Sequence, residues 1–385
     1  MAGRSSRGVA FRSVAIRSVA CWRVAFRGVA FVAVVALAAW LPAQEQTDPD
    51  EARRVLVVIN QPSQDSLLVG TYYRSKRNIP RENVVFIDVS RTEEISNSEY
   101  RSAIERPVRA AIAKLRHRID FIVLTKGVPI RVRDGKYSVD ALLAAMDMAF
   151  KPIVKAEESE IRRAISPYFM KDEPFDSEKF GFYLVTRLDG YTLADAKALV
   201  DNSLAAKPDK GPFFFDEAAN RKSSGYIEMQ STLGKAHRIL RQKGFESSLD
   251  ETSKFVAPAD GLMGYASWGS NDSSYEPASY KKIRFRPGAI CETFVSTSGR
   301  TFRQLSPLDK SKGQSLITDL IAGGVTGIKG YVSEPFTFAL AKPEILFDRY
   351  TSGRNLAESF YAASMVLKWK GIVIGDPLCS PYAKR

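Results

Sequence analysis

Short runs of β-branched and aliphatic residues recur along this chain, and stretches with helical character separate them. The first three runs are RVLVVIN (54–60), VVFIDV (84–89) and IDFIVLT (119–125). Strands separated by helices of crossover length pair in parallel through right-handed connections. The sequence therefore predicts an α/β fold with a doubly wound, Rossmann-like and mostly parallel sheet flanked by helices.

The same alternation continues to the C-terminus. We expect later strands at 181–186, 261–266, 289–295, 325–332 and 372–377, and later helices after Thr192 and over 226–242, 314–322 and 355–367. The charged, proline-containing stretch 150–180 is typical of an insertion or a surface excursion. We predict a single α/β unit over 44–385, with an N-terminal half at 54–206 and a C-terminal half at 207–385.

The first 43 residues differ in composition from the rest. They contain six arginines, no lysine and no acidic residue, and they lead into the apolar run 29–42. A basic region followed by an apolar region predicts a secretion signal. The run is shorter than the roughly 18 to 20 residues that span a bilayer, and the small residue Ala43 follows it. We therefore expect cleavage near Ala43, an exported protein in the periplasm or outside the cell, and membrane contact only through an uncleaved leader.

The positive charge of the chain does not indicate a nucleic-acid partner. The net charge is +13, and loss of the leader with its six arginines leaves +7. Nucleic-acid sites concentrate Lys and Arg on one element with interleaved aromatic residues, whereas here basic and acidic residues alternate throughout. We expect no nucleic-acid partner, and the composition does not identify the ligand or protein that the chain binds.

Few residues are available for metal or thiol chemistry. The body of the chain has two cysteines, Cys291 and Cys379, and the whole chain has two histidines, His117 and His237, which we place on helices. No Cys/His spacing fits a zinc site, and no acidic loop has EF-hand spacing. We predict no metal and no cofactor. An exported protein could join the two cysteines in a disulfide, but Cys291 lies inside an apolar strand, so we favour two buried free thiols.

Ligands of doubly wound sheets bind beyond the carboxyl ends of the strands. The loops that follow the predicted strands place these polar residues at that edge: Lys126, Asp189, Asn271, Asp272, Ser296, Thr297, Ser298, Arg300, Glu334 and Asp376. Trp268 is either a packing residue or a platform on which a ligand stacks. Asp189 before Gly190 is also typical of a turn residue, and Asp376 before Pro377 of a strand end.

Several long strings carry a resemblance to a family of exported bacterial proteins. They are LTKGVPIR (124–131), LVTRLDG (184–190), YASWGSND (265–272), ETFVSTSGRTF (292–302), AGGVTGIKGYVSEP (322–335) and IGDPLC (374–379). The resemblance covers nearly the whole chain after the leader, and it implies no particular function.

The order of these segments also resembles, more distantly, the gingipain-type cysteine peptidases, which implies a caspase-like fold. In those enzymes a histidine lies in the loop that aligns with 267–272, and the nucleophilic cysteine follows the strand that aligns with 289–295. This chain has no histidine in the first loop, Ser296-Thr297-Ser298 after the second strand, and Cys291 inside that strand. The resemblance therefore indicates a fold and a location for the site, but not Cys/His peptidase chemistry.

Three functional hypotheses follow. The first is a binding or scaffold protein that lacks the Cys/His dyad, with Trp268, Asn271, Arg300 and Glu334 as ligand-binding candidates. The second is a peptidase-like hydrolase with non-standard catalytic residues, for which the candidates are Asp272, Ser298, Lys126 and Asp189. A serine nucleophile needs a base, which Lys126 or Asp272 could supply. The third is a surface or matrix protein without a pocket.

Overall fold

Two fully buried strands form the centre of the N-terminal part of the main sheet. Every residue of β1 (Val55–Asn60) and of β4 (Phe121–Thr125) is buried, as expected for strands covered by helices on both faces. The computed structural model describes residues 49–133, 137–149, 157–258, 261–306, 308–309 and 313–384. The predicted leader lies outside the described residues. Residues Gln46–Arg385 form one compact unit.

The main sheet has ten strands in the order β2-β1-β4-β7-β13-β12-β11-β10-β8-β9. The other strands of this sheet are β2 (Val84–Ile87), β7 (Leu184–Leu188), β8 (Phe213–Asp216), β9 (Ser247–Asp250), β10 (Gly261–Ser267), β11 (Arg284–Thr293), β12 (Gly327–Tyr331) and β13 (Gly371–Ile374). The strands β2, β1, β4 and β7 pair in parallel with one another, and so do the strands β12, β11, β10, β8 and β9. β13 runs antiparallel to β12, with Ile328 opposite Ile374. The predicted α/β class and mostly parallel sheet are confirmed.

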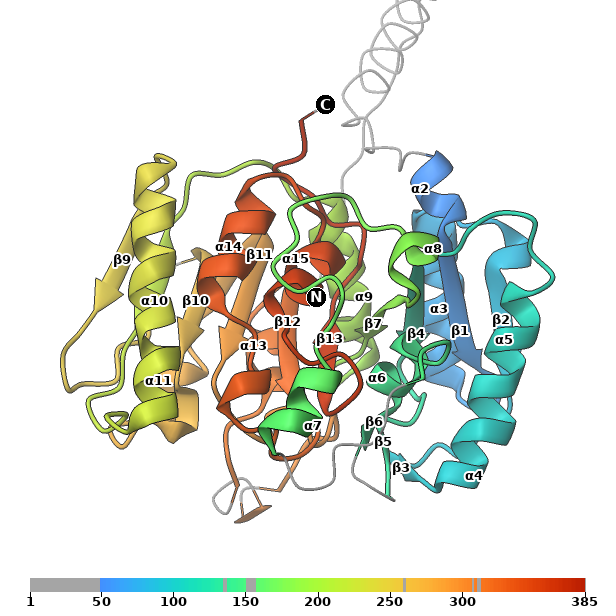
Figure 1. The fold of residues 1–385 in the computed structure, drawn as a ribbon, viewed down its shortest axis with the longest axis horizontal. Helices are drawn as coiled ribbons and strands as arrows, with labels where there is room; N and C mark the ends of the chain where they lie inside the picture. Colours follow the sequence, from blue (N-terminus) through green and yellow to red (C-terminus); the bar gives the residue numbers. More distant parts are fainter. Residues whose placement is uncertain are drawn as a thin grey trace, which may run out of the picture. The chain divides into compact units, whose positions relative to one another are not determined.

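Helices cover both faces of this sheet. The described helices are α2 (Pro49–Arg53), α3 (Gln64–Lys76), η1 (Arg81–Asn83), α4 (Asn97–Glu99), the π-helix η2 (Tyr100–Glu105), α5 (Arg106–Ile112), α6 (Val139–Ala144), α7 (Glu158–Arg163), α8 (Ser177–Phe180), α9 (Leu193–Leu204), α10 (Ser224–Gln242), η3 (Gly269–Asn271), α11 (Pro277–Tyr280), α13 (Ile317–Ala322), η4 (Thr337–Ala339), α14 (Pro343–Thr351) and α15 (Leu356–Ala363). Helices α10, α14 and α15 pack side by side in front of the strands in Figure 1, and α3 and α9 pack together behind them.

The chain returns to the middle of the sheet at its C-terminal end. β13 lies between β7 and β12, so the last strand joins the strands of the N-terminal half to those of the C-terminal half. Asp376, just after β13, is fully buried and accepts hydrogen bonds from Tyr73 Oη at 2.9 Å and from Arg77 Nε at 2.6 Å. These bonds attach the segment after β13 to the end of α3. Asp376 therefore has a structural role at the end of its strand, which is one of the alternatives that the sequence allowed.

Two strands of the main sheet were not predicted from the sequence. β8 and β9 lie in the stretch that shows no clear alternation, and β9 forms one edge of the sheet with only its first residue buried. The helix expected to reach His117 ends at Ile112, and His117 lies in the turn beyond it. His237 lies on α10 as expected.

A second, three-stranded sheet lies beside the main one. It consists of β3 (Glu94–Ile95), β5 (Arg131–Val132) and β6 (Tyr137–Ser138), with β5 in the middle. β3 follows β2 and β5 follows β4, so the small sheet joins the loops that follow the two strands on either side of β1. These loops become the wall of the site described below.

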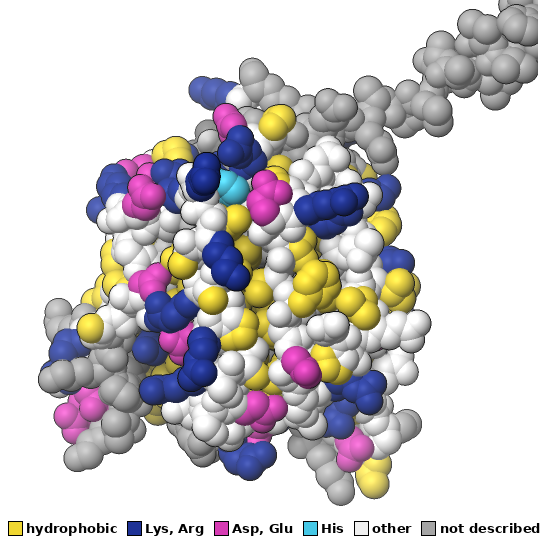
Figure 2. All heavy atoms as spheres, turned by 90° about the vertical axis from the view of Figure 1, so that its right-hand side faces the viewer, with side chains coloured by type: hydrophobic (Ala, Val, Ile, Leu, Met, Phe, Trp, Pro, Cys, Tyr) yellow, Lys and Arg dark blue, Asp and Glu magenta, His cyan; other side chains and the backbone are white. Residues whose placement is uncertain are grey.

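The β2 edge of the main sheet is partly open. Figure 2 shows this face, with apolar side chains near its centre and both signs of charge around them. On these elements, Phe86 of β2 and Leu68 of α3 are exposed by 56% and 41%. Within the described residues, no helix has the length and apolar character needed to cross a membrane.

Candidate ligand-binding cleft

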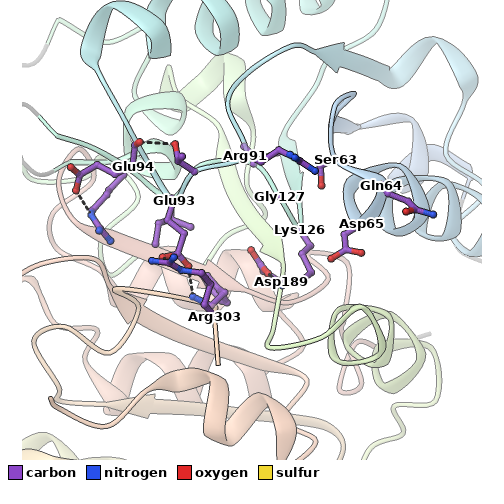
Figure 3. A pocket seen from close by; sticks show the side chains of 15 residues that line it. Ser63, Gln64, Asp65, Arg91, Glu93, Glu94, Lys126, Gly127, Asp189 and Arg303 are labelled. Carbon is purple, nitrogen blue, oxygen red and sulfur yellow. Dashed lines mark hydrogen bonds and ion pairs between the residues drawn. The ribbon is translucent and has the colours of Figure 1, made fainter. Parts of the chain in front are cut away.

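A cleft lies where the loops after β1, β2, β4 and β7 meet the loop after β11. Its larger part has a volume of about 690 Å³, and residues of all five loops line it, among them Ser63, Lys126 and Asp189 (Figure 3). An adjoining part of about 460 Å³ extends to Arg300 and Ser333. The two parts share the side chains of Glu93, Glu94, Arg131 and Arg303. The two parts of the cleft therefore adjoin each other at these four side chains.

The end of β1 holds the neighbouring loops in place. Asn60 Nδ2 donates to the carbonyl of Gly127 at 2.8 Å, and its Oδ1 accepts from the backbone N–H of Val89 at 3.2 Å. Gly127 has a φ of +95°, and a Cβ at this position would overlap Ser63 Oγ. Only glycine lets this loop approach the first turn of α3 so closely, where Ser63 caps the helix by accepting from Ser66 N–H.

Lys126 and Asp189, both predicted from the sequence, lie together in the larger part of the cleft. Lys126 Nζ is 3.1 Å from Asp189 Oδ1 and donates to the carbonyl of Gly190 at 2.7 Å. Burial raises the pKa of Asp189, while the charges of Lys126 and Arg187 oppose that rise. Asp189 Oδ1 also accepts the N–H of Gly190, the next residue, at 2.9 Å. Asp189 thus fixes the backbone just after β7 and lines the cleft as well.

A buried guanidinium supports this part of the cleft from below. Arg187 of β7 is fully buried, and it donates to the carbonyls of Val128 at 2.7 Å and Pro129 at 2.9 Å and forms an ion pair with Asp140 of α6 at 2.7 Å. It fixes the loop after β4 against α6. The sequence analysis did not single it out, although an arginine inside an apolar strand is a usable signal, because a buried charge requires partners.

Glu93 connects the loop after β2 to the loop after β11. Its Oε1 accepts hydrogen bonds from Thr301 Oγ1 and from the N–H of Phe302, both at 2.8 Å, and its Oε2 is 3.3 Å from Arg303 Nε. Figure 3 shows Glu93 and Arg303 meeting at one side of the cavity. One carboxylate therefore holds together loops from the two halves of the chain.

Arg131 makes a second connection of the same kind. Its Nε is 2.7 Å from Glu94 Oε2, and its Nη1 donates to the carbonyl of Arg300 at 2.5 Å. The hydrogen bonds from Arg131 and Arg133 lower the pKa of Glu94, which favours its ionised form. Glu93, Glu94, Arg131 and Arg303 were not predicted, because nothing in their local sequence distinguishes them from ordinary charged loop residues.

Arg300, a predicted ligand-binding residue, lines the smaller part of the cleft. Its guanidinium is half-buried, and within the described residues it makes one hydrogen bond, from Nη1 to the carbonyl of Thr297 at 3.1 Å, and no ion pair. Burial lowers the pKa of Arg300, and only the more distant Tyr191 and Asp319 act against that decrease. The cleft thus contains a partly desolvated cation without a carboxylate partner among the described residues.

Trp268 lies away from this cleft, in the core. It is 1% exposed, its Nε1 donates to Gln230 Oε1 at 2.8 Å, and its ring packs edge-to-face against Tyr226 and Phe294. This placement fits the packing role that the sequence allowed, because no face of the ring is open for a ligand to stack on.

Asn271 joins the two loops in which the resemblance to gingipains indicates the site. Its Nδ2 donates to the carbonyl of Phe294 at 2.6 Å, and its Oδ1 accepts from Gln314 Nε2 at 2.9 Å. Gln314 Oε1 in turn accepts from Thr297 Oγ1 at 2.8 Å. Asp272, which is 5% exposed, accepts from the N–H of Ser274 at 2.8 Å, and burial raises its pKa. These groups bond to one another and to the backbone.

Two further candidates also lie apart from the described lining of the cleft. Ser298 is fully buried; its carbonyl accepts from the N–H of Ile317 at 3.1 Å, and its Oγ has no hydrogen-bond partner among the described residues. Glu334 is exposed and accepts from the N–H of Phe336 at 3.2 Å. The structure thus places Lys126 and Asp189 in the larger part of the cleft and Thr297 and Arg300 in the smaller part, while the other predicted residues do not belong to its described lining.

The residues of a Cys/His peptidase site are not assembled in the described chain. Cys291 and Cys379 are free and buried, so the thiol alternative is the one observed. His117 Nε2 lies 2.9 Å from Asn83 Oδ1, and His237 Nδ1 lies 3.0 Å from Ser247 Oγ. The described part of the chain contains no group of His, Cys, Asp and Glu side chains that could hold a metal ion.

Comparisons with known proteins add little to this description. No protein-family model matches the sequence, and no curated protein matches it. A solved structure titled "Structure of Protease" is similar to this chain at 11% sequence identity and a TM-score of 0.46, over 86% of this chain and 78% of that chain.

Proposed function

We propose that this protein binds a ligand with an anionic group, and that Arg300 holds this group in the cleft. The observation that carries the proposal is the state of Arg300: a half-buried guanidinium with one backbone hydrogen bond and no ion pair within the described residues, in a cavity of about 460 Å³. Burying a charge without a partner is unfavourable. An anionic ligand would supply that partner, and charge-assisted hydrogen bonds to guanidinium groups are strong.

Binding without peptidase turnover fits the residues of the cleft. The two described cysteines are buried, and neither histidine lines the described cleft. The charged side chains of the walls are engaged in cross-loop pairs that fix the shape of the cleft, such as Glu93 with Arg303 and Lys126 with Asp189. A preformed cavity with few convergent polar groups is typical of a binding site.

The test is a thermal-shift titration of the mature chain with acetate and with inorganic phosphate. A ligand at about 100 times its Kd stabilises a protein by about 2.7 kcal/mol, which is an increase in Tm of about 4 °C for a unit of this size at an unfolding entropy of about 2.1 cal/mol/K per residue. We expect acetate to give this increase in the native chain but not in Arg300→Met; phosphate is the second anion tested. The matched control is Arg238→Met, on the exposed face of α10. Equal shifts in Arg300→Met and the native chain would refute the role of Arg300.

A hydrolase with non-standard residues is the second candidate. One observation favours it: Asp189, beside Lys126 in the cleft, has a raised pKa, and carboxyl groups with perturbed pKa values cluster at catalytic sites. Activity-based labelling of the mature chain with a serine-reactive phosphonate tests it. A mapped adduct on Ser296, Thr297 or Ser298, or turnover that is lost in Asp272→Ala or Ser298→Ala at unchanged Tm, would favour the hydrolase. If the native protein is not labelled and shows no turnover, the hydrolase is refuted and the binding protein remains the proposed function.

We further propose that the protein is exported, with cleavage near Ala43. The composition of the leader supports this proposal. N-terminal sequencing of the protein recovered from the periplasm or the medium tests it, since a start near Gln44 is expected. Recovery of only the full-length chain from the cytoplasm would contradict it.

A further inference from the structure

Among the described residues, the smaller part of the cleft combines one cation without an ion pair, Arg300, with an apolar wall. The side chains of Val132, Leu305 and Val332 line the same cavity as Arg300. We propose that this cavity binds the C-terminal end of a polypeptide with an apolar last residue, whose α-carboxylate pairs with Arg300 while its side chain packs against the apolar wall. The inference rests on the proposed function, because it names the ligand that brings the anion.

The charge of the cavity indicates a ligand with a single negative charge. Its described lining contains three guanidinium groups, of Arg131, Arg300 and Arg303, and two carboxylates, of Glu93 and Glu94, so that these residues carry one excess positive charge. A phosphate monoester carries about −1.5 to −2 at pH 7 and would lie close to two glutamates, where like charges repel. The single negative charge of a carboxylate matches the positive charge of Arg300, which forms no ion pair with either glutamate.

The neighbouring polar groups fit the peptide bonds that precede a C-terminal residue. Thr297 Oγ1 donates its hydrogen to Gln314 and Thr301 Oγ1 donates to Glu93, each at 2.8 Å. Thr301 Oγ1 also accepts the N–H of Arg303 at 3.1 Å. A hydroxyl oxygen can accept two hydrogen bonds, so both hydroxyls keep an acceptor position that suits an amide N–H donor. The larger part of the cleft, which adjoins this cavity, has a volume of about 690 Å³ that would take the residues before the last.

The arrangement also distinguishes a C-terminus from an acidic side chain. A C-terminal apolar residue presents its carboxylate and its side chain from one Cα atom, so both the guanidinium and the apolar wall are occupied at once. The carboxylate of an internal Asp or Glu residue has no apolar group attached beside it. Because apolar burial stabilises by about 25 cal/mol per Å², the wall adds affinity only for the first kind of ligand.

The experiment is a fluorescence-anisotropy titration of the mature chain with three labelled hexapeptides. One ends in leucine with a free carboxylate, one is its C-terminal amide, and one ends in an aspartate amide. A hydrogen bond to a charged group contributes about 1.5–3 kcal/mol, which corresponds to roughly 10- to 100-fold in Kd. We therefore expect the free acid to bind at least about tenfold more tightly than either amide. Equal affinities for the three, or no binding of any, would overturn the inference.

Variants separate this ligand from general electrostatic attraction. Arg300→Met should abolish the preference for the free acid, and Arg238→Met should keep it. A Cβ at Gly313 would lie 2.5 Å from Arg300 Nη2, so Gly313→Ala displaces the guanidinium without changing the net charge and should weaken binding several-fold at unchanged Tm. Leu305→Ser should reduce the preference for leucine over glycine as the last residue. Retention of full affinity in Gly313→Ala and Leu305→Ser would count against the assigned pose.

The failure of this inference differs from failure of the proposed function. If acetate or phosphate stabilises the native chain but not Arg300→Met, while the peptides show no preference for the free acid, the anion site stands and the polypeptide ligand is refuted. If Arg300→Met changes neither the small-anion shift nor peptide binding, both proposals are refuted.

Discussion

Replacing Asp216 by asparagine should change how the stability of this protein depends on pH. Asp216 ends β8, is 1% exposed, and accepts one hydrogen bond, from the N–H of Val256 at 3.2 Å. Burial raises the pKa of Asp216 to about 8, and the charges of Asp272 and Asp250 act in the same direction. The folded protein therefore holds a proton on this carboxyl over a pH range in which the unfolded chain has released it.

The sign and the size of the effect follow from linkage. Because the folded pKa lies above the unfolded value, the stabilising contribution is complete below about pH 4 and is lost as the pH rises to about 8. Each pH unit inside this window changes the free energy of unfolding by about 1.4 kcal/mol. Between pH 5 and pH 7 the native chain should lose about 2.7 kcal/mol relative to Asp216→Asn, because asparagine has the shape of the protonated acid and does not ionise.

The assay is urea unfolding followed by tryptophan fluorescence at half-unit steps from pH 5 to pH 8. The curves of the native chain and Asp216→Asn should diverge with the slope given above, while Asp88→Asn, which removes an exposed carboxylate just after β2, should follow the native chain. Parallel curves for the native chain and Asp216→Asn across this window would refute the burial argument for Asp216.

Two further outcomes follow from buried groups. Asp376→Ala leaves Arg77 buried without its carboxylate. Because removing one partner of a buried ion pair costs about 3–5 kcal/mol, urea unfolding should show a loss of stability of this size. A loss below about 1 kcal/mol would mean that the pair behaves as a surface pair. Cys291 and Cys379, both buried, should react with a maleimide only after unfolding, and mass spectrometry of the folded protein that shows either adduct would contradict their burial.

The strands with a strong local signal were predicted well. β1 and β4 lie inside the runs assigned to them, because a strand buried on both faces reads as a continuous apolar run. β9 gave no such signal: its sequence SSLD is polar, and its position at the sheet edge leaves most of its residues partly exposed. Its place in the sheet comes from pairing with β8, which a local pattern does not contain.

The residues that form the walls of the cleft could not be predicted for the same reason, because their partners are distant in the sequence. The hydrogen bond between Glu93 and Thr301 joins residues 208 positions apart, and neither residue lies in a distinctive local motif. Lys126, Asp189 and Arg300 could be proposed because each follows a recognisable strand, and the rule that ligands bind beyond strand ends applies to each separately. The rule does not tell which of the strand-end residues meet, and it grouped Asp272 and Ser298 with them although they lie apart from the described lining of the cleft.

The two places where a ligand was expected differ in whether their polar side chains already have partners within the protein. In the loops that the resemblance to gingipains singled out, Asn271, Gln314 and Thr297 form a chain of hydrogen bonds that uses their side-chain donors and acceptors on one another. Such a set stabilises the loops, and it holds no charge that needs a partner from a ligand. Three residues beyond Thr297, Arg300 keeps a half-buried charge that no described carboxylate neutralises. Since an unpaired buried charge is the costlier state, its retention in a cavity is better explained by a partner that arrives with the ligand than by a role in holding the fold together.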